Sequence, residues 1–308
     1  MADFIKAIIF GIVEGVTEWL PISSTGHMII LNEIMELKVS TNFMNTFLVV
    51  IQLGAILAVV ALYWHRIWPL YYAEDKNEYG RTKGRKITVD KNIIDLWIKI
   101  IIACIPAVVV GLLLDDWVDA HFYNWGCVSL MLILVGAAFI YVETRMDIRP
   151  TIRSVDEIDY LTAFKIGLFQ VIAAIFPGTS RSGATIIGSL LLGVSRRAAA
   201  EFTFMLAIPV MFGASILKLF KNGLGYSAKE WFLLLVGMLV AFAVSVVVIR
   251  VLLEFIKRHN FVPFGIYRIV LGCIVVIYFF FFWTQKPEYD ENGIRTVMLT
   301  LRGLFPAV

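Results

Sequence analysis

The segment 14-EGVTEWLPISSTGH-27 places two acids, a proline and a run of hydroxyls inside an otherwise apolar stretch, residues 3–35. Proline removes a backbone N–H and clashes with the preceding turn, so a helix that enters this segment has to end near Pro21. Irregular backbone at membrane depth survives only where protein or water satisfies its polar groups. The segment therefore predicts a re-entrant helical hairpin, broken at its tip and facing a polar cavity.

A second segment of the same kind lies in the other half of the chain. The stretch 177-PGTSRSGAT-185 interrupts the apolar residues 161–193 with a proline, two glycines, hydroxyls and an arginine. By the same argument, it predicts a second re-entrant hairpin.

The rest of the chain is dominated by long apolar runs. Of its 308 residues, 59% are hydrophobic and 17% charged, against about 45–50% and about 25% in soluble domains. A run of about 20 apolar residues is long enough to cross a bilayer as a helix. The sequence predicts an all-α integral membrane protein with full transmembrane helices at about 43–64, 93–114, 122–143, 201–220, 229–253 and 262–283.

Basic residues between the spans orient the chain. Segment 65–92 holds seven Lys and Arg, whereas 115–121 holds none and carries three Asp, so the first is predicted inside and the second outside. Following the spans, the basic loops 144–160, 194–200 and 254–261 also fall inside. The first hairpin then enters from outside and the second from inside.

Opposite entry of the two hairpins predicts an inverted-topology repeat, with halves at about 1–143 and 161–283. Aligning Pro21 with Pro177 places Glu14 opposite Gln170 and Ser24 opposite Ser180. Such repeats place their sites near the midplane, where the broken elements meet. We expect one polytopic membrane domain, 1–283, followed by a C-terminal tail, 284–308.

Glu14 and Glu18 are spaced to project from one face of the first half-helix. Helical carboxylates are usually a solvated face, but these two are flanked by Ile12, Val13 and Leu20. Ionisable groups within a span cost several kcal/mol. Two close carboxylates share a proton or hold a cation, so the pair predicts a divalent metal site or an acid/base pair.

The hydroxyls after Pro21 precede a second half-helix, whose N-terminus presents N–H donors to an anion. His27 can transfer a proton near neutral pH and follows Ser24 by three residues, so it is expected beside it. Single residues of these types are often only caps or structural groups. The whole cluster, with Ser23, Thr25 and Gly26 beside the two glutamates, is expected to be functional.

In the second hairpin, Arg181 offers a planar fork of donors that suits phosphate oxygens. Its alternative role is a structural ion pair with an embedded acid such as Glu14. Its neighbours include Gly178, Thr179, Ser180 and Ser182, and the glycines of this segment permit close approach of the backbone. Gln52 interrupts the span 43–64 and is expected to line the cavity.

Other partner classes lack support in the sequence. The formal charge of +3 is small and the basic residues lie in separate loops, so no nucleic-acid face is predicted. There is no GxxxxGK[ST] loop, so use of ATP is not indicated.

The whole chain resembles the undecaprenyl-diphosphate phosphatase family of bacterial membranes, also called bacitracin-resistance proteins. The likeness rests on Glu14–His27 and Pro177–Thr185, with weaker matches at Ile51–Gly54 and around Tyr267-Arg268. It implies hydrolysis of undecaprenyl diphosphate to undecaprenyl phosphate and inorganic phosphate, which recycles the lipid carrier for cell-wall synthesis. It also implies a divalent cation, Mg²⁺ or Ca²⁺, a location in the plasma membrane with the site facing outside, and a homodimer.

Carried over to this sequence, the resemblance implies catalytic roles for Glu14, Glu18, Ser24, His27 and Arg181, with the metal on Glu14 and Glu18. It implies that the substrate phosphates are lined by Ser23, Thr25, Thr179, Ser180 and Ser182, with Gly26 and Gly178 also at the substrate. The nucleophile stays open between Ser24 activated by His27 or Glu18, His27 itself, and a metal-bound water. The main rival function is a carrier or flippase for a phosphate-bearing lipid, because inverted repeats with a midplane site are also how secondary transporters are built.

Overall fold

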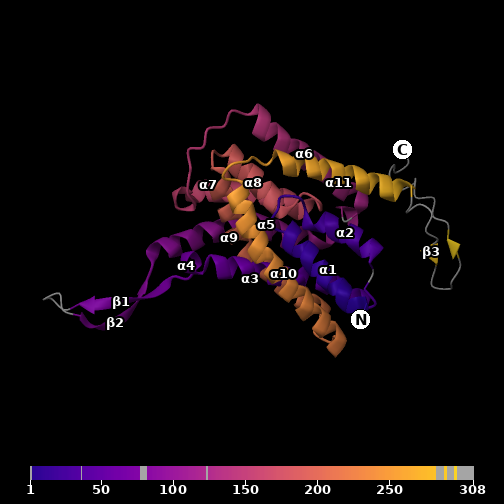
Figure 1. Ribbon diagram of the computed structural model, residues 1–308, viewed down its shortest axis with the longest axis horizontal. Helices are drawn as coiled ribbons and strands as arrows, with labels where there is room; N and C mark the ends of the chain where they lie inside the picture. The colour runs from indigo at the N-terminus through magenta and orange to yellow at the C-terminus, as the bar shows by residue number, and fades with distance from the viewer. Residues whose placement is uncertain are drawn as a thin grey trace.

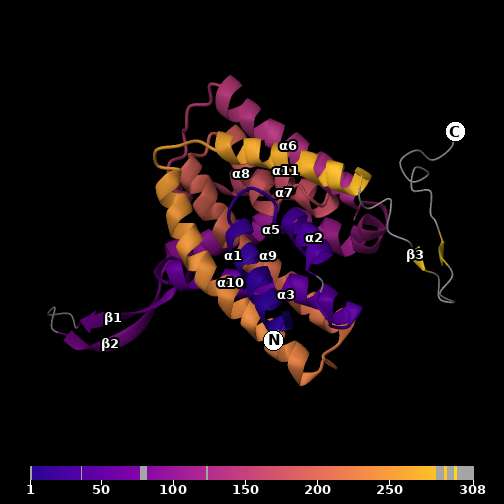
Figure 2. The same ribbon diagram turned by 45° about the vertical axis from the view of Figure 1, so that its right-hand side comes forward.

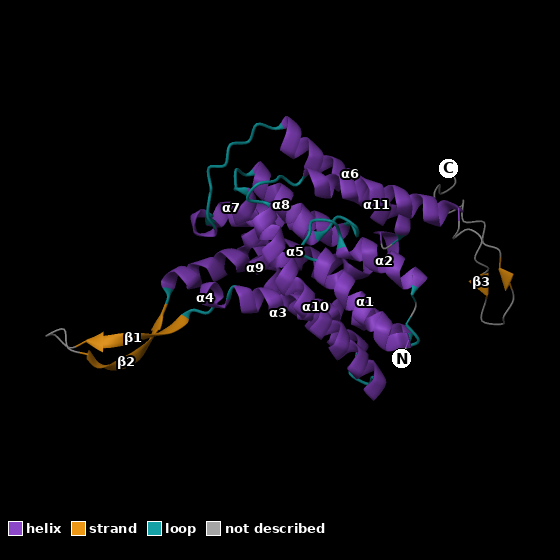
Figure 3. Ribbon diagram, viewed as in Figure 1, coloured by secondary structure: helices purple, strands orange, loops and turns teal. Residues whose placement is uncertain are grey.

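The computed structural model describes residues 2–35, 37–76, 82–122, 124–281, 288–289 and 295–296. Helices make up most of this part of the chain (Figure 3). Their bounds are α1 Ala2–Thr17, α2 Ser24–Ile34, α3 Thr41–Leu62, α4 Trp64–Ile67, α5 Lys91–Phe122, α6 Trp125–Arg145, η1 Val155–Glu157, α7 Tyr160–Ile175, α8 Arg181–Leu191, α9 Arg196–Asn222, α10 Ala228–Phe255 and α11 Val262–Phe281.

The six predicted spans are confirmed as long apolar helices. In the described residues, α3, α5, α6, α9, α10 and α11 are each long and apolar enough to cross a membrane. Helix α5 continues to Phe122, so segment 115–121 is helical and not a loop. The chain is an integral membrane protein of helical construction.

The two motif segments break their helices where the sequence predicts. Helix α1 ends at Thr17 and α2 begins at Ser24, while α7 ends at Ile175 and α8 begins at Arg181. All four helices have 16 residues or fewer, too short for a typical span of about 20. Each motif therefore joins two short helices.

A β-hairpin between α4 and α5 was not predicted. Strands β1, Leu70–Lys76, and β2, Thr82–Val89, pair antiparallel with Leu70 opposite Val89. The hairpin projects from the helices (Figure 1). In the predicted tail, β3, Glu288–Tyr289, pairs with β4, Arg295–Thr296, and the rest of 284–308 lies outside the described residues.

The short helices are held by close packing on long ones. Helix α1 packs along α10 and α7 along α5, while α6 lies beside α11 (Figures 1 and 2). Trp19, in the turn after α1, is fully buried, and its ring meets Phe204 of α9 edge to face at 5.2 Å. This aromatic contact fixes the first motif against the centre of the protein.

The four basic loops gather at one end of the helices. Arg66 forms ion pairs with Asp156 and Glu201, at 3.2 and 3.0 Å. The backbone N–H of Ser195 donates to the carbonyl of Ile152. Arg196 pairs with Glu143, whose carboxylate also accepts from the backbone of Phe261. The segments predicted to lie inside therefore share one face of the molecule.

Candidate active site

The two motif turns use the same backbone device. Ser23 and Ser180 have φ values of 73° and 70° and are the N-caps of α2 and α8. Each hydroxyl accepts the N–H of the glycine three residues later, Gly26 or Gly183. Non-glycine residues in this region cost about 1–3 kcal/mol and cluster at functional sites. Both turns therefore direct a helix N-terminus into the interior.

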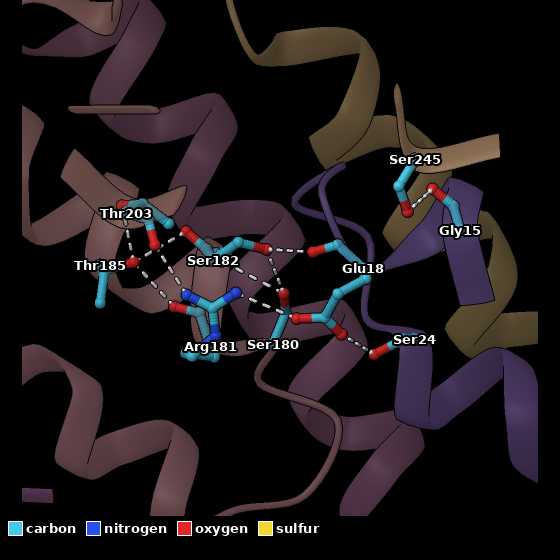
Figure 4. Close-up of polar contacts among 10 residues, drawn as sticks. Gly15, Glu18, Ser24, Ser180, Arg181, Ser182, Thr185, Thr203 and Ser245 are labelled. Atoms are coloured by element: carbon cyan, nitrogen blue, oxygen red, sulfur yellow. Dashed lines mark hydrogen bonds and ion pairs between the residues drawn. The ribbon is translucent and has the colours of Figure 1, made fainter. Parts of the chain in front are cut away.

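Glu18 connects the two motifs (Figure 4). Its Oε2 accepts a hydrogen bond from Ser24 Oγ at 2.7 Å. Its Oε1 accepts one from Arg181 Nη2 at 3.0 Å, and only 7% of the Glu18 side chain and 12% of the Arg181 side chain are exposed. An acid, a hydroxyl and a guanidinium from opposite halves of the sequence thus meet in one buried cluster.

The guanidinium of Arg181 is oriented by the second half of the chain. Its Nη1 donates to the carbonyl of Thr203 at 2.8 Å, and the Thr203 hydroxyl bonds that of Thr185 at 2.9 Å. In the described part of the protein, Nε of Arg181 is buried without a hydrogen-bond partner. A buried N–H of this kind costs free energy until it finds an acceptor, and a phosphate oxygen would supply one.

Ser182 closes the contact between the motifs. Its hydroxyl lies 3.0 Å from that of Ser180 and donates to the backbone carbonyl of Glu18 at 3.3 Å.

The predicted alternative role of Arg181, an ion pair with an embedded acid, is present in the structure. Its partner is Glu18, however, and not Glu14.

The surroundings of Glu14 fit the role of a cation ligand. It is 1% exposed, and among the described residues neither of its carboxylate oxygens has a hydrogen-bond partner. Glu18 follows Glu14 by one helical turn, and its backbone N–H donates to the Glu14 carbonyl at 3.0 Å. No set of three metal-ligating side chains gathers in the described residues. Mg²⁺ is commonly held by one or two carboxylates, with phosphate and water completing its shell, which is the donor set that this acid pair offers.

His27 does not bond Ser24 within the described structure, although their spacing suggested contact. Its Nδ1 lies 2.7 Å from the Ser23 carbonyl and its Nε2 lies 2.8 Å from the Tyr267 hydroxyl. A carbonyl can only accept, so Nδ1 carries the proton and Nε2 of the neutral ring accepts from Tyr267. The acceptor that holds Ser24 is therefore Glu18.

Arg268 is a residue of the site that the sequence reasoning did not assign. It is fully buried in α11. Its guanidinium donates to the carbonyls of Pro21, Gly178 and Thr179, at 3.1, 2.8 and 2.9 Å. One cation thus ties both motif turns together. A charged residue inside an apolar span is rare and usually functional, and this signal was present in the sequence.

The remaining predicted residues differ in their burial and in their contacts with the cluster. Thr179 is 1% exposed, and its hydroxyl has no partner among the described residues. Gly178 has φ +92°, and an added Cβ would meet the Val128 carbonyl at 2.6 Å, so a side chain is excluded there. Thr25 follows Ser24 on α2. Gln52 is half-buried in α3, and no hydrogen bond in the described structure joins it to the cluster.

The arrangement has the parts of a phosphoryl-transfer site. It offers a hydroxyl bonded to a carboxylate, a guanidinium with an unused donor, a second acid without a partner, and two helix N-termini. Phosphoryl transfer needs an activated nucleophile together with donors that neutralise the phosphate oxygens.

Comparisons with known proteins agree with this chemistry. The family model described as bacitracin resistance protein BacA matches residues 7–274. The undecaprenyl-diphosphatase of Desulfitobacterium hafniense is 55% identical over 280 residues, which is 91% of this chain and 97% of that protein. Undecaprenyl-diphosphatase 1 of Clostridium acetobutylicum is 55% identical over 278 residues, covering 90% and 97%. The Enterococcus faecalis undecaprenyl-diphosphatase is 50% identical over 276 residues, covering 89% and 96%. The chain belongs to the BacA bacitracin-resistance family.

Proposed function

We propose that this protein hydrolyses undecaprenyl diphosphate to undecaprenyl phosphate and inorganic phosphate, and so recycles a lipid carrier for cell-wall synthesis. The observation that carries the proposal is the buried contact of Ser24 and Arg181 with opposite oxygens of Glu18. Anion binding alone would not require a hydroxyl held by a carboxylate. The names of the relatives support the same reaction.

Substrate binding prepares the nucleophile. In the free protein, Glu18 shares its charge between Arg181 and Ser24. The terminal phosphate competes with Glu18 for the guanidinium, because phosphate oxygens form strong charge-assisted bonds to arginine. As Arg181 turns to the phosphate, Glu18 loses its cationic partner and becomes a stronger base toward the Ser24 hydroxyl.

The reaction then proceeds by double displacement. Ser24 Oγ attacks the terminal phosphorus, its proton passes to Glu18, and the bond from that phosphorus to the bridging oxygen breaks. Glu18 passes this proton to the bridging oxygen as undecaprenyl phosphate leaves, so Glu18 is a carboxylate again and Ser24 is phosphorylated. Water, deprotonated by Glu18, cleaves the phosphoseryl bond, and inorganic phosphate departs. Ser24 recovers its proton from Glu18, so the enzyme returns to its first state.

We include a divalent cation in the proposal because of the surroundings of Glu14. Glu14, with Glu18 beside it, would hold the ion, and the ion would supply positive charge to the diphosphate oxygens. Glu14 is buried without a hydrogen-bond donor among the described residues, and a buried ionised carboxylate needs a cation or a proton. Mg²⁺ suits two carboxylates completed by phosphate and water.

Charge and symmetry support our proposal for where the site lies in the membrane. The four basic loops share one face, which by the positive-inside rule is cytoplasmic. Helix α1 packs on α10 as α7 packs on α5, and Gly136 and Gly265 meet where α6 crosses α11. These paired contacts support an inverted repeat of halves 1–143 and 161–283, with two re-entrant hairpins. The first opens to the outside, where we place the hydrolysis.

Phosphate release by the purified protein tests the function. Detergent-purified protein is given undecaprenyl diphosphate with and without a chelator. We expect release that needs the divalent cation and falls in Arg181→Ala. Transport of the lipid across vesicles without any phosphate release would replace the enzyme with a carrier. The homodimer stays a prediction, which light scattering of the detergent complex would test.

A further inference from the structure

An apolar groove lies between α1 and the start of α11. Its volume is about 460 Å³, and its walls include Val13, Val16, Leu20 and Phe264. Small-molecule sites commonly have volumes of about 300–1,000 Å³, so the groove can hold part of a ligand.

The polar side chains in the groove wall are already satisfied. These are Thr17, His27 and Tyr267. The Thr17 hydroxyl donates to the Val13 carbonyl at 2.7 Å, and His27 and Tyr267 bond each other at 2.8 Å and stack with ring centroids 5.6 Å apart. A wall with no free donor or charge favours an apolar occupant over an anion.

The groove lies beside the catalytic cluster, and its wall includes neighbours of the cluster residues but not Glu18, Ser24 or Arg181. Thr17 directly precedes Glu18, and His27 bonds the carbonyl of Ser23, the cap of the helix that Ser24 begins. The groove also opens at the surface, where Ile12 is 42% and Tyr267 45% exposed. A chain bound there would have one end at the reacting hydroxyl and the other in the surrounding hydrocarbon.

We propose that the groove between α1 and α11 binds the isoprene units of the substrate next to the diphosphate. This inference rests on the proposed function. The His27–Tyr267 pair separates the apolar chain from the polar cluster, and the remainder of the chain extends into the bilayer. Branched apolar walls match a branched isoprenoid through buried area and not through hydrogen bonds.

Photo-cross-linking tests the inference directly. The probe is a prenyl diphosphate with a photoreactive group on its isoprene units nearest the diphosphate, bound to full-length Ser24→Ala protein so that it is not consumed. We expect mass spectrometry to find the label on residues 12–20, which comprise the end of α1 and the turn after it, or on residues 263–267 of α11. Labelling confined to other helices would overturn the inference.

Enzyme kinetics of two tryptophan variants provide an independent test. Val16→Trp fills the groove, whereas Ile5→Trp makes the same change on the same helix at a side chain that is 52% exposed and outside the groove. With undecaprenyl diphosphate, we expect kcat/KM to fall at least tenfold in Val16→Trp and to stay within twofold in Ile5→Trp. Equal kcat/KM values in the two variants would contradict the proposal that the groove binds the isoprene units. A wild-type protein that releases no phosphate would instead contradict the function, so the two failures are distinguishable.

Discussion

The two motif turns share a backbone and differ in chemistry. Ser23 and Ser180 cap their helices with nearly the same φ and bond glycines at the same spacing. The first turn lies between Glu18 and Ser24, whereas the second is followed by Arg181. In the proposed mechanism, the first turn carries the acid and the nucleophile, and the second carries the phosphate-binding cation. This mechanism requires both turns, because Glu18 bonds Ser24 after the first turn and Arg181 after the second.

Removing the hydroxyl from each turn should separate the two roles most sharply. Ser24→Ala removes the nucleophile, and we expect loss of activity of about 10³-fold or more. Ser180→Ala removes only a cap and a neighbour of Ser182, so it should retain more than a tenth of the activity. Phosphate release from undecaprenyl diphosphate measures both variants. A Ser24→Ala rate near that of the wild type would remove Ser24 from the mechanism.

The second turn is tested by Arg181→Lys, which keeps the charge but loses the planar fork. One ammonium cannot reproduce the planar donors that bind Glu18 and the Thr203 carbonyl in the free protein and that bind phosphate oxygens when the substrate is present. We expect a fall in kcat/KM of about 10²-fold. Arg250→Lys, at an exposed position on α10, is the matched control and should change little. Full activity in Arg181→Lys would show that the fork is unnecessary.

Arg268 tests whether the two turns must be held together. In Arg268→Met, three carbonyls from the two turns lose their donor, and each unsatisfied group costs about 1–3 kcal/mol. We expect a Tm lower by more than about 5 °C and activity reduced about tenfold as the turns separate. Arg250→Met provides the control in the same thermal-shift assay. Unchanged Tm in Arg268→Met would mean that the turns hold their positions without it.

The smallest effect concerns the shared backbone. Ser23→Ala and Ser180→Ala each remove one N-cap hydrogen bond, which costs about 0.5–2 kcal/mol. Because the caps have the same geometry, we expect equal decreases in stability, measured by thermal unfolding in one detergent. A loss confined to one variant would show that the turns are not equivalent.

Much of the fold was predictable because apolar runs set the spans. Pro21 and the segment 177–183 correctly marked where the short helices break. The β-hairpin at 70–89 was missed because the segment was interpreted by its charge alone. Pairing Ser24 with Ser180 followed from aligning prolines, whereas the helix caps pair Ser23 with Ser180. One residue of offset changes which side chain faces the site.

The sequence predicted which residues form the candidate site better than it predicted the contacts between them. Glu18, Ser24 and Arg181 do meet, but helical spacing placed His27 beside Ser24, and the ring instead turns back to the Ser23 carbonyl. Its other partner, Tyr267, is 240 residues away in sequence, so no local pattern could reveal it. Arg268 was visible as a charge within an apolar span, yet its carbonyl partners depend on the tertiary fold.

The stereochemical course at phosphorus tests most directly the central claim that a group of the enzyme, and not water, attacks it first. Undecaprenyl diphosphate with a terminal phosphorus made chiral by sulfur and oxygen isotopes is hydrolysed in isotopically labelled water, and the configuration of the released thiophosphate is determined. Two successive displacements, through phosphorylated Ser24, predict net retention of configuration. Net inversion would mean a single attack by water and would contradict the account.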